Sequence, residues 1–445
     1  MPVSIQGPKG TRDFYPDGMA VRRHIEGVWR RASVDCGFDE VEGPTFEHLT
    51  LYTAKSGPGI VNELFSFRRA GGDDDYALRP EFTPTLARMV AARAGSLPLP
   101  VKWFAVPVHF RAERQQRGRL REFVQWNVDL MGVEGAAADA EVIGCAVLAM
   151  ERLGLKPMDM RVRLSHRGAV AASLVAAGVP VERTGEAFEL LDRREKLEPA
   201  EFDRRAASLG LHADARARFD GIAATRLSVG SDASAIATTL GVPADALGGA
   251  DALAQQLGSM GLAEWCEWDF GIVRGLAYYT GTVFEMHEAR GNERAVAGGG
   301  RYDGLVELFG GPRTPAFGFG MGDVVLGLVL ADRGLLPKDA SALLPRPDVF
   351  LITDGSDAAE AMQPRLLTAL RRAGLHVRGN WKATRHVGKL LGDAAKVRAR
   401  LAVILGAELG EGAVSVKDLD GGSQEKVAVA DLERHLVARC RASGA

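Results

Sequence analysis

The chain contains 445 residues, of which 46% are hydrophobic and 25% are charged, and its formal net charge at pH 7 is −2. This length fits about three domains of roughly 150 residues each, and the composition is that of a globular protein with sizeable hydrophobic cores. The nearly balanced charge excludes nucleic-acid binding through overall positive charge, so any basic surface must be local.

The cysteines and the apolar segments indicate a cytoplasmic protein. Cys36, Cys145, Cys266 and Cys440 are far apart in the sequence and show neither CxxC spacing nor a disulfide framework. We expect each to be a small buried hydrophobic residue in a reducing compartment. The first residues contain no hydrophobic signal region, and no apolar run approaches the length needed to span a membrane.

The first predicted element is a helix between Asp17, which can cap its amino end, and Gly37, which can end it. Its apolar residues recur at helical spacing. Residues 38–47 then predict a strand that contains Pro44. Because proline lacks a backbone N–H, this strand is expected at a sheet edge or an interface.

Two further strands, residues 101–113 and 123–131, flank an arginine-rich loop. Every second residue of the later strand is apolar: Val124, Trp126, Val128 and Leu130. The residues between them are polar or aromatic: Phe123, Gln125, Asn127 and Asp129. On the earlier strand, His109, Arg111 and Glu113 share one face. A polar face of this composition suits the floor of a polar ligand site.

The rest of the chain divides by composition. Residues 168–265 are rich in Ala, Leu, Arg and Glu at helical spacing and predict a helical insertion between two parts rich in strands and glycines, residues 1–167 and 266–332. Residues 333–347 have the composition of a linker. Residues 348–445 alternate strands and helices and predict a separate small α/β domain.

The stretch FRAERQQRGRLREFVQW, residues 110–126, carries the strongest chemical signal. Arg111 offers a rigid fork of donors that fits phosphate oxygens. Glu113 can accept from an exocyclic amine, and Phe123 can stack on a base. Together these residues indicate a nucleotide site. An exposed, solvated hairpin loop is the alternative that the residues alone leave open.

This stretch resembles motif 2 of the class II aminoacyl-tRNA synthetases, and other segments resemble the histidyl-tRNA synthetases in particular. The segments that carry the resemblance are PKGTRDFYP, GFDEVEGPTFE, LRPEFTPTLAR, REFVQWNVDLMG, VRGLAYYTGTVFE and AGGGRYDGLVELFGGPRTPAFGFGMG. The resemblance covers nearly the whole chain. It implies an α+β catalytic core, an antiparallel sheet with flanking helices formed by residues 1–167 and 266–332, and an anticodon-binding domain in residues 348–445.

The resemblance also implies roles for single residues. The α-ammonium group of histidine would be held by Glu81, Thr83 and Gln125. The imidazole would be read by Asp129 and Tyr278, with Tyr279 in the same signature. ATP would be bound by Arg111, Glu113, Arg121 and Phe123. Arg111 and Arg274 would be the catalytic arginines at the α-phosphate, where both reactants are anionic and Mg²⁺ assists.

Two positions depart from the family's commonest pattern. Ala277 stands where an acid is usual, and Val325 stands where motif 3 usually has an arginine near the γ-phosphate. Losing one charged phosphate contact costs about 1.5–3 kcal/mol unless another group replaces it. Arg301 and Arg313 are the candidate replacements, and the sequence does not place either of them.

The implied activity is ATP-dependent ligation of L-histidine to tRNA(His) by a homodimer, with no membrane partner. The helical insertion would contact the acceptor stem, and basic residues of the last domain would contact the anticodon region. Those residues are Lys382, Arg385, Lys389, Lys396, Arg398 and Arg400. A solvated helix face is the alternative for each of them.

Two other functions remain open. One is a histidine-binding regulatory paralogue of the synthetases, which would lack the anticodon-binding domain and active-site residues. The loss of the arginine at Val325 favours it, whereas residues 348–440, Arg111, Glu113 and Arg274 argue against it. The other is a ligase that adenylates a different small amino acid, against which Asp129 and the paired tyrosines argue.

Overall fold

The computed structural model describes residues 5–56, 58–194, 197–273, 278–291, 293–381 and 386–442. The chain forms two compact units, Met1–Leu343 and Leu344–Ala445. Among the described residues, no helix has both the length and the apolar character needed to cross a bilayer.

The first unit is built on one large sheet, which in the described residues has the strand order β1-β5-β7-β13-β12-β11-β8-β10-β9, with β6 paired to β7. The strands are β1 (Asp39–Glu40), β5 (Val101–Ala105), β6 (Val108–Phe110), β7 (Glu122–Met131), β8 (Met160–His166), β9 (Arg226–Ser228), β10 (Cys266–Asp269), β11 (Thr282–Glu288), β12 (Ala297–Arg301) and β13 (Ala316–Gly322). Only the pairs β1–β5 and β8–β10 are parallel within this described sheet. The predicted antiparallel core is therefore confirmed, with parallel pairing near its two edges.

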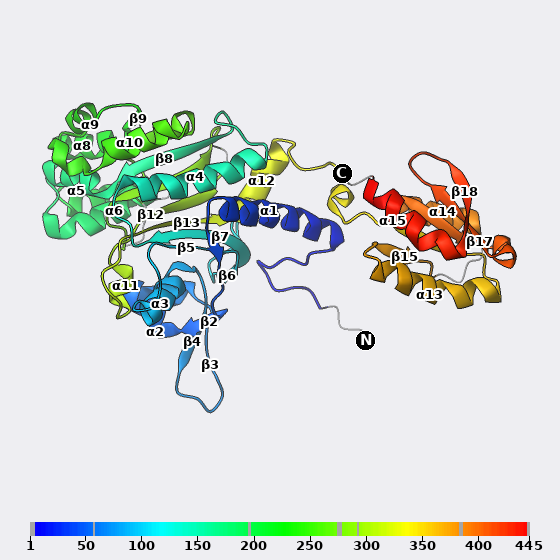
Figure 1. Ribbon diagram of the computed structural model, residues 1–445. Coiled ribbons are helices and arrows are strands. Elements are labelled where there is room, and N and C mark those ends of the chain that lie inside the picture. The colour runs from blue at the N-terminus through cyan, green and yellow to red at the C-terminus, as the bar shows by residue number, and fades with distance from the viewer. Residues whose placement is uncertain are drawn as a thin grey trace. The chain divides into compact units, whose positions relative to one another are not determined.

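Helices cover both faces of this sheet (Figure 1). On one face lie α1 (Pro16–Asp35), α4 (Ala136–Arg152) and α12 (Asp323–Asp332). On the other lie α2 (Leu49–Ser56), α3 (Thr83–Arg93) and α11 (Leu305–Leu308). The apolar residues predicted on β7, Val124, Trp126, Val128 and Leu130, all belong to the core under α1 and α4. The alternation of β7 thus assigns its other face to the site.

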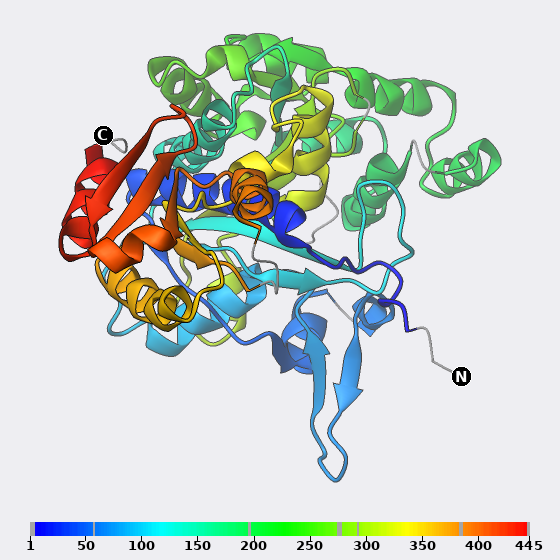
Figure 2. The same ribbon diagram turned by 90° about the vertical axis from the view of Figure 1, so that its right-hand side faces the viewer.

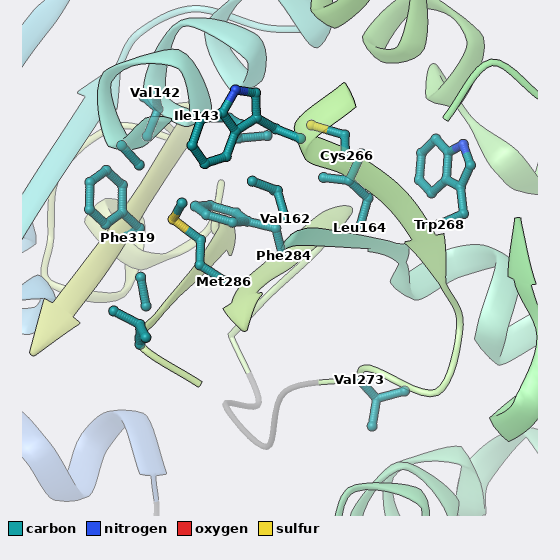
Figure 3. Packing of buried hydrophobic residues seen from close by; sticks show 14 of the residues in the cluster. Val142, Ile143, Val162, Leu164, Cys266, Trp268, Val273, Phe284, Met286 and Phe319 are labelled. Atoms are coloured by element: carbon teal, nitrogen blue, oxygen red, sulfur yellow. The ribbon is translucent and has the colours of Figure 1, made fainter. Parts of the chain in front are cut away.

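Farther along the sheet, the same core continues under α4 (Figure 3). Phe284 and Met286 of β11 lie beside Val162 of β8, and Val142 and Ile143 of α4 lie above them. Cys145 and Cys266 are buried in this core and Cys440 is buried in the second unit, as the sequence predicts, whereas Cys36 is only partly buried.

Three local expectations need correction. Asp17 does not cap α1: Tyr15 is the N-cap residue, and Asp17 lies in the first turn behind Pro16. Residues 38–47 do not form one strand, because β1 ends at Glu40 and the chain resumes at β2 (Phe46–His48) in another sheet. Pro44, which cannot donate a ladder hydrogen bond, lies between them. The strand predicted at 101–113 is likewise divided into β5 and β6 on either side of Pro107.

β2 belongs to a three-stranded sheet of order β2-β4-β3, with β3 (Ser66–Arg68) and β4 (Asp75–Leu78). This sheet projects from the first unit as a long hairpin, drawn in blue below the large sheet (Figure 1, Figure 2). Between β8 and β10 the chain forms β9 and a group of helices: α5 (Arg167–Ala176), α6 (Thr184–Arg193), α7 (Pro199–Ser208), α8 (Ala213–Ala224), α9 (Ala233–Leu240) and α10 (Ala250–Ser259).

The second unit is the α/β domain expected from the sequence. Its sheet has the order β15-β14-β16-β17-β18, parallel from β15 to β16 and antiparallel beyond. The strands are β14 (Val349–Thr353), β15 (Val377–Gly379), β16 (Leu401–Leu405), β17 (Ala413–Asp418) and β18 (Gln424–Ala428). α13 (Asp357–Arg372) and α15 (Leu432–Ala442) pack on one face, and α14 (Val387–Lys396) packs on the other.

One carboxylate joins three segments of the first unit. Asp323, the first residue of α12, accepts from the Val124 backbone N–H at 2.9 Å and pairs with the Arg12 guanidinium at 2.6 Å. Gly322 is the N-cap residue, so Asp323 does not cap the helix but links α12 to β7 and to the amino-terminal segment. Its side chain is only 6% exposed.

We therefore expect Asp323→Ala to lower the free energy of unfolding by about 2–4 kcal/mol, since it leaves a buried N–H and a guanidinium without their acceptor. Urea titration followed by tryptophan fluorescence measures this. Asp332→Ala, at the other, exposed end of α12, is the control and should change the value by less than about 1 kcal/mol. Equal losses in the two variants would contradict the role given to Asp323.

Candidate active site

A cavity of about 860 Å³ opens on the polar face of the large sheet. β7, β11, β12 and β13 line it, together with the loop before β7, the loop between β11 and β12, and the start of α12. Three residues predicted for ATP or histidine binding, Arg111, Phe123 and Gln125, lie in its wall. Its volume suits a nucleotide-sized ligand.

The pairing of β6 with β7 positions the aromatic part of this site. His109 lies opposite Phe123 in the strand register, and their rings stack with centroids 5.6 Å apart. The Arg111 guanidinium lies 5.1 Å from the centre of the Phe123 ring, and its Nε donates to the Pro80 carbonyl oxygen at 3.1 Å. A cation and an aromatic face therefore lie side by side, as a phosphate and a base would require.

The arginine-rich loop forms a closed hairpin turn. Gln116 and Arg119 exchange backbone hydrogen bonds at 3.1 and 2.9 Å, and Gly118 between them has a φ of 73°. The Glu113 carboxylate accepts from the Arg119 guanidinium at 2.6 Å. Arg121 lies at the base of the turn, where its Nε donates to the Glu113 carbonyl oxygen at 3.3 Å. The loop is thus not merely solvated, because its charged groups pair with one another.

A second group of predicted residues lies along the same face of β7. Asp129 is buried, and its carboxylate accepts from the Tyr302 hydroxyl. The ring of Tyr302 is 6.0 Å from that of Tyr278, which in turn is 4.8 Å from that of Tyr279. The Tyr278 hydroxyl donates to the Glu81 carboxylate at 3.3 Å. Thr83, the first residue of α3, follows Glu81 by two positions.

The glycines of β13 make room for these side chains. A Cβ on Gly318 would lie 2.0 Å from Asp129 Oδ1, and a Cβ on Gly320 would lie 2.7 Å from the Gln125 amide carbon. Both residues pair directly with β7, so neither strand can move aside without breaking the ladder. The alternation of glycine with Phe317, Phe319 and Met321 therefore reflects a steric demand on one face of the strand.

Burial changes the protonation of this second group. It raises the pKa of Asp129 to about 7, while the hydrogen bond from Tyr302 opposes that rise. Burial likewise holds the pKa of both Tyr278 and Tyr302 well above the usual range, so both keep their hydroxyl protons. Asp129 is therefore the group here whose charge changes near neutral pH.

An internal lysine occupies the predicted ammonium site. The Lys55 ammonium, whose side chain is 2% exposed, pairs with the Glu81 carboxylate and lies 4.0 Å from the centre of the Tyr278 ring. Burial lowers its pKa, and the Glu81 carboxylate acts against that shift. Glu81 and Tyr278 thus bind a primary ammonium group in this structure. No sequence pattern singles out Lys55, because its burial arises from the packing of α2.

The remaining residues singled out from the sequence differ in where they lie. Arg274 and Ala277 fall outside the described residues. Val325 lies in the cavity wall, as its place after β13 implies. Arg301 is unsuited to replace the missing arginine because its guanidinium pairs with Asp139 and Asp303. Arg313 is exposed and is absent from the lining of the cavity.

The residues of the site that sequence reasoning missed include Lys55, Arg119, Glu285, Arg294 and Tyr302. The segments that contain Arg119 and Tyr302 were recognised, but the partner of each side chain depends on the fold.

Comparison with known proteins assigns the family. The family model described as histidyl-tRNA synthetase matches residues 10–322, and the model described as anticodon binding domain matches residues 348–439. The chain belongs to the histidyl-tRNA synthetase family. The histidine–tRNA ligase of Opitutus terrae is 39% identical over 94% of each chain, and that of Halobacterium salinarum is 38% identical over 95% of each. The crystal structure of histidyl-tRNA synthetase from Nostoc sp. PCC 7120 matches with a TM-score of 0.78 and 25% identity, over 98% of this chain and 100% of that one.

In this synthetase fold, Gly318→Ala should displace the Asp129 carboxylate and break its hydrogen bond with Tyr302. We expect a loss of about 1–3 kcal/mol in the free energy of unfolding, since the β ladder prevents relief of the clash. Gly327→Ala, in α12, is the control: a Cβ there meets nothing within 4 Å, and alanine favours helix. A Gly318→Ala protein as stable as Gly327→Ala would refute the steric argument.

Tyr302→Phe should raise the pKa of Asp129 further, because it removes the hydrogen bond that stabilises the carboxylate. A carboxyl group whose pKa is raised on folding holds a proton that the unfolded chain releases. The free energy of unfolding therefore falls as pH rises from about 4 to about 7, and this fall should extend to higher pH in Tyr302→Phe. Urea titrations across this range measure it. Tyr76→Phe, in β4 of the separate three-stranded sheet, should leave the profile unchanged, and an unshifted profile in Tyr302→Phe would contradict the assignment.

Proposed function

We propose that this chain ligates L-histidine to tRNA(His) through histidyl-adenylate. The carboxylate of histidine attacks the α-phosphate of ATP and releases diphosphate; the histidyl group then passes to the terminal adenosine of the tRNA. The observation that carries this proposal is that one strand face carries two different groups of binding residues. Arg111 and Phe123 lie at one end of it, and the buried Asp129 lies at the other, beside the Glu81–Tyr278 pair.

For ATP, we assign the base to Phe123 and Glu113 and the phosphates to Arg111 and Arg121. Phe123 offers a face for stacking. The Glu113 carboxylate can accept from the exocyclic amine of adenine while it also accepts from Arg119. Arg111 stands beside Phe123, at the distance of an adjoining phosphate. The family resemblance adds Arg274 as the second catalytic arginine. No general base is needed, because the attacking carboxylate is already ionised.

Mg²⁺ would enter this site bound to ATP. The described residues contain no group of three or more His, Cys, Asp or Glu side chains that could hold a metal ion. Phosphate oxygens and waters supply most Mg²⁺ ligands in such sites, with one or two carboxylates from the protein. We assign Glu285, a carboxylate of the cavity wall that also contacts His287, to this role. The ion would neutralise the charge that develops on the departing diphosphate.

For histidine, we assign the α-ammonium group to Glu81, Thr83 and Gln125, and the imidazole to Asp129, Tyr278 and Tyr279. The Lys55 ammonium at Glu81 supports this, because it meets the same carboxylate and ring that the substrate would use. The imidazole offers an N–H to an acceptor, which Asp129 provides in its ionised form. A buried acceptor left unpaired by other amino acids gives strong discrimination.

For tRNA, we assign the anticodon to the second unit and the acceptor stem to the helical region of residues 168–265. The match of residues 348–439 to an anticodon-binding domain supports the first assignment. Lys389 and Lys396 lie on α14, and Arg398 and Arg400 follow it. Lys382 and Arg385 fall outside the described residues. Residues 1–167 and 266–332 would form the catalytic core, with residues 333–347 as the linker.

We further propose a cytoplasmic homodimer. The projecting three-stranded sheet exposes an aromatic cluster: Phe46, Phe67 and Tyr76 lie within 5.8 Å of one another between ring centroids, with His48 beside Tyr76. Phe46 is 47% exposed and Phe67 is 43% exposed. Rings that expose so much apolar surface are typical of an interface. A monomer in sedimentation equilibrium at micromolar concentration would contradict this.

The regulatory alternative is less well supported. The chain has the second unit, which matches an anticodon-binding domain, and it has arginines and an acid in the nucleotide site. Val325 is the feature in its favour.

Exchange of labelled diphosphate into ATP tests the proposal. Exchange should require histidine and should fall to background with each of the other amino acids. Arg111→Gln should lower the rate by about 100-fold or more, since one charged contact to the reacting phosphate is lost. Histidine binding without exchange in the wild-type protein would instead support the regulatory function. Exchange with another amino acid alone would support a ligase that adenylates that amino acid.

A further inference from the structure

The cavity wall contains a partly buried cation for which the described residues supply no paired carboxylate. Arg294, in the loop between β11 and β12, lines the cavity and is partly buried. Among the described residues, no carboxylate lies within ion-pair distance of its guanidinium. Burial lowers its pKa, as do the charges of Arg119 and Arg111, while the charges of Glu113 and Glu285 act against the shift. A partly desolvated guanidinium that no carboxylate pairs with is unfavourable unless an anionic ligand joins it.

Arg294 meets the arginine-rich loop and α12 at one point. A Cβ placed on Gly118 would lie 3.9 Å from the Arg294 Cδ and 3.2 Å from a methyl carbon of Val325. The stem of Arg294 therefore lies near Val325, on the wall of the cavity. The Glu293 Oε2 atom also lies 3.9 Å from that Cβ, so the wall here has an apolar side chain from α12 and both a cation and a carboxylate from the β11–β12 loop.

Glu293, next to Arg294, pairs with the arginine-rich loop and so holds the β11–β12 loop against it. Glu293 accepts from Arg117 Nε at 2.8 Å, and its side chain is only 4% exposed. Arg117 also lies 3.7 Å from the Asp332 carboxylate of α12. Glu293 thus joins the β11–β12 loop to the arginine-rich loop, and the next residue, Arg294, lines the cavity.

We propose that Arg294 binds the diphosphate end of ATP, the β- and γ-phosphates that leave as diphosphate. This deepens the proposed function and rests on it. Arg111, beside the Phe123 ring, is placed for the phosphate nearest the base. Arg119 already shares its charge with Glu113. Arg294 is a further cation of this wall, and it lies near Val325, where α12 offers no charged side chain of its own.

The test compares Arg294→Gln with the wild-type protein in calorimetric titrations of ATP, diphosphate and AMP on the full-length chain. Loss of one charge-assisted contact should weaken ATP and diphosphate by about 10- to 100-fold. AMP, which lacks the phosphates in question, should change by less than about twofold. Arg294→Lys, which keeps the charge but not the fork, should recover part of the loss.

Arg114→Gln is the matched control. Arg114 is exposed at the start of the same arginine-rich loop and is absent from the cavity lining, so its loss removes one positive charge without touching the wall. Equal weakening of ATP by Arg294→Gln and Arg114→Gln would reduce the effect to general electrostatics and overturn the proposal. Equal weakening of AMP and ATP by Arg294→Gln would place Arg294 elsewhere in the site, or make it structural, and would also overturn it.

These titrations separate this proposal from the proposed function. A wild-type protein that binds ATP but shows no histidine-dependent exchange would remove the synthetase activity, while the comparison of ATP with AMP would still decide the role of Arg294. A wild-type protein that binds neither ATP nor diphosphate would overturn both.

Discussion

The site depends on the close approach of β7 to β13. Side chains as large as Gln125 and Asp129 can lie on a strand face only if the paired strand has no side chains there, and Gly320 and Gly318 meet that condition. The opposite faces of the same two strands carry Trp126, Phe317, Phe319 and other core residues. The core therefore fixes the register, and the register in turn places the polar groups.

A second property of the site is that most of its charged groups are paired internally without substrate. Glu81 pairs with Lys55, Glu113 with Arg119, and Asp129 with Tyr302. Each pair limits the cost of keeping a polar group in a dry cavity. Ligands must then exchange partners with the protein rather than meet bare charges, so specificity depends on how well a substrate replaces each internal contact. Lys55 is the clearest case, because its ammonium has the same chemistry as the proposed ligand.

The fold also shows what surrounds Val325, which stands where the family usually has an arginine. In sequence it is only the loss of a cation after β13. In the fold, the wall beside it also contains Arg294, which belongs to a loop some thirty residues earlier in the chain. Arg301, which the sequence made a candidate replacement, is instead paired with Asp139 and Asp303. Which arginine faces the cavity is decided by contacts between loops, and spacing along the chain does not reveal such contacts.

The sequence by itself determined the family, the antiparallel core, the separate α/β domain and the two faces of β7, because strand alternation and the motifs are local properties of neighbouring residues. Pro44 and Pro107 showed where it falls short: both lie where a predicted single strand divides, since proline interrupts the ladder and only the fold decides which sheet the chain joins next. The partners of Asp323, Asp129 and Glu81 were decided by tertiary structure alone. Each partner comes from a distant segment, and burial, which sets both the pKa of Asp129 and the cost of an unpaired Arg294, exists only once those segments have packed.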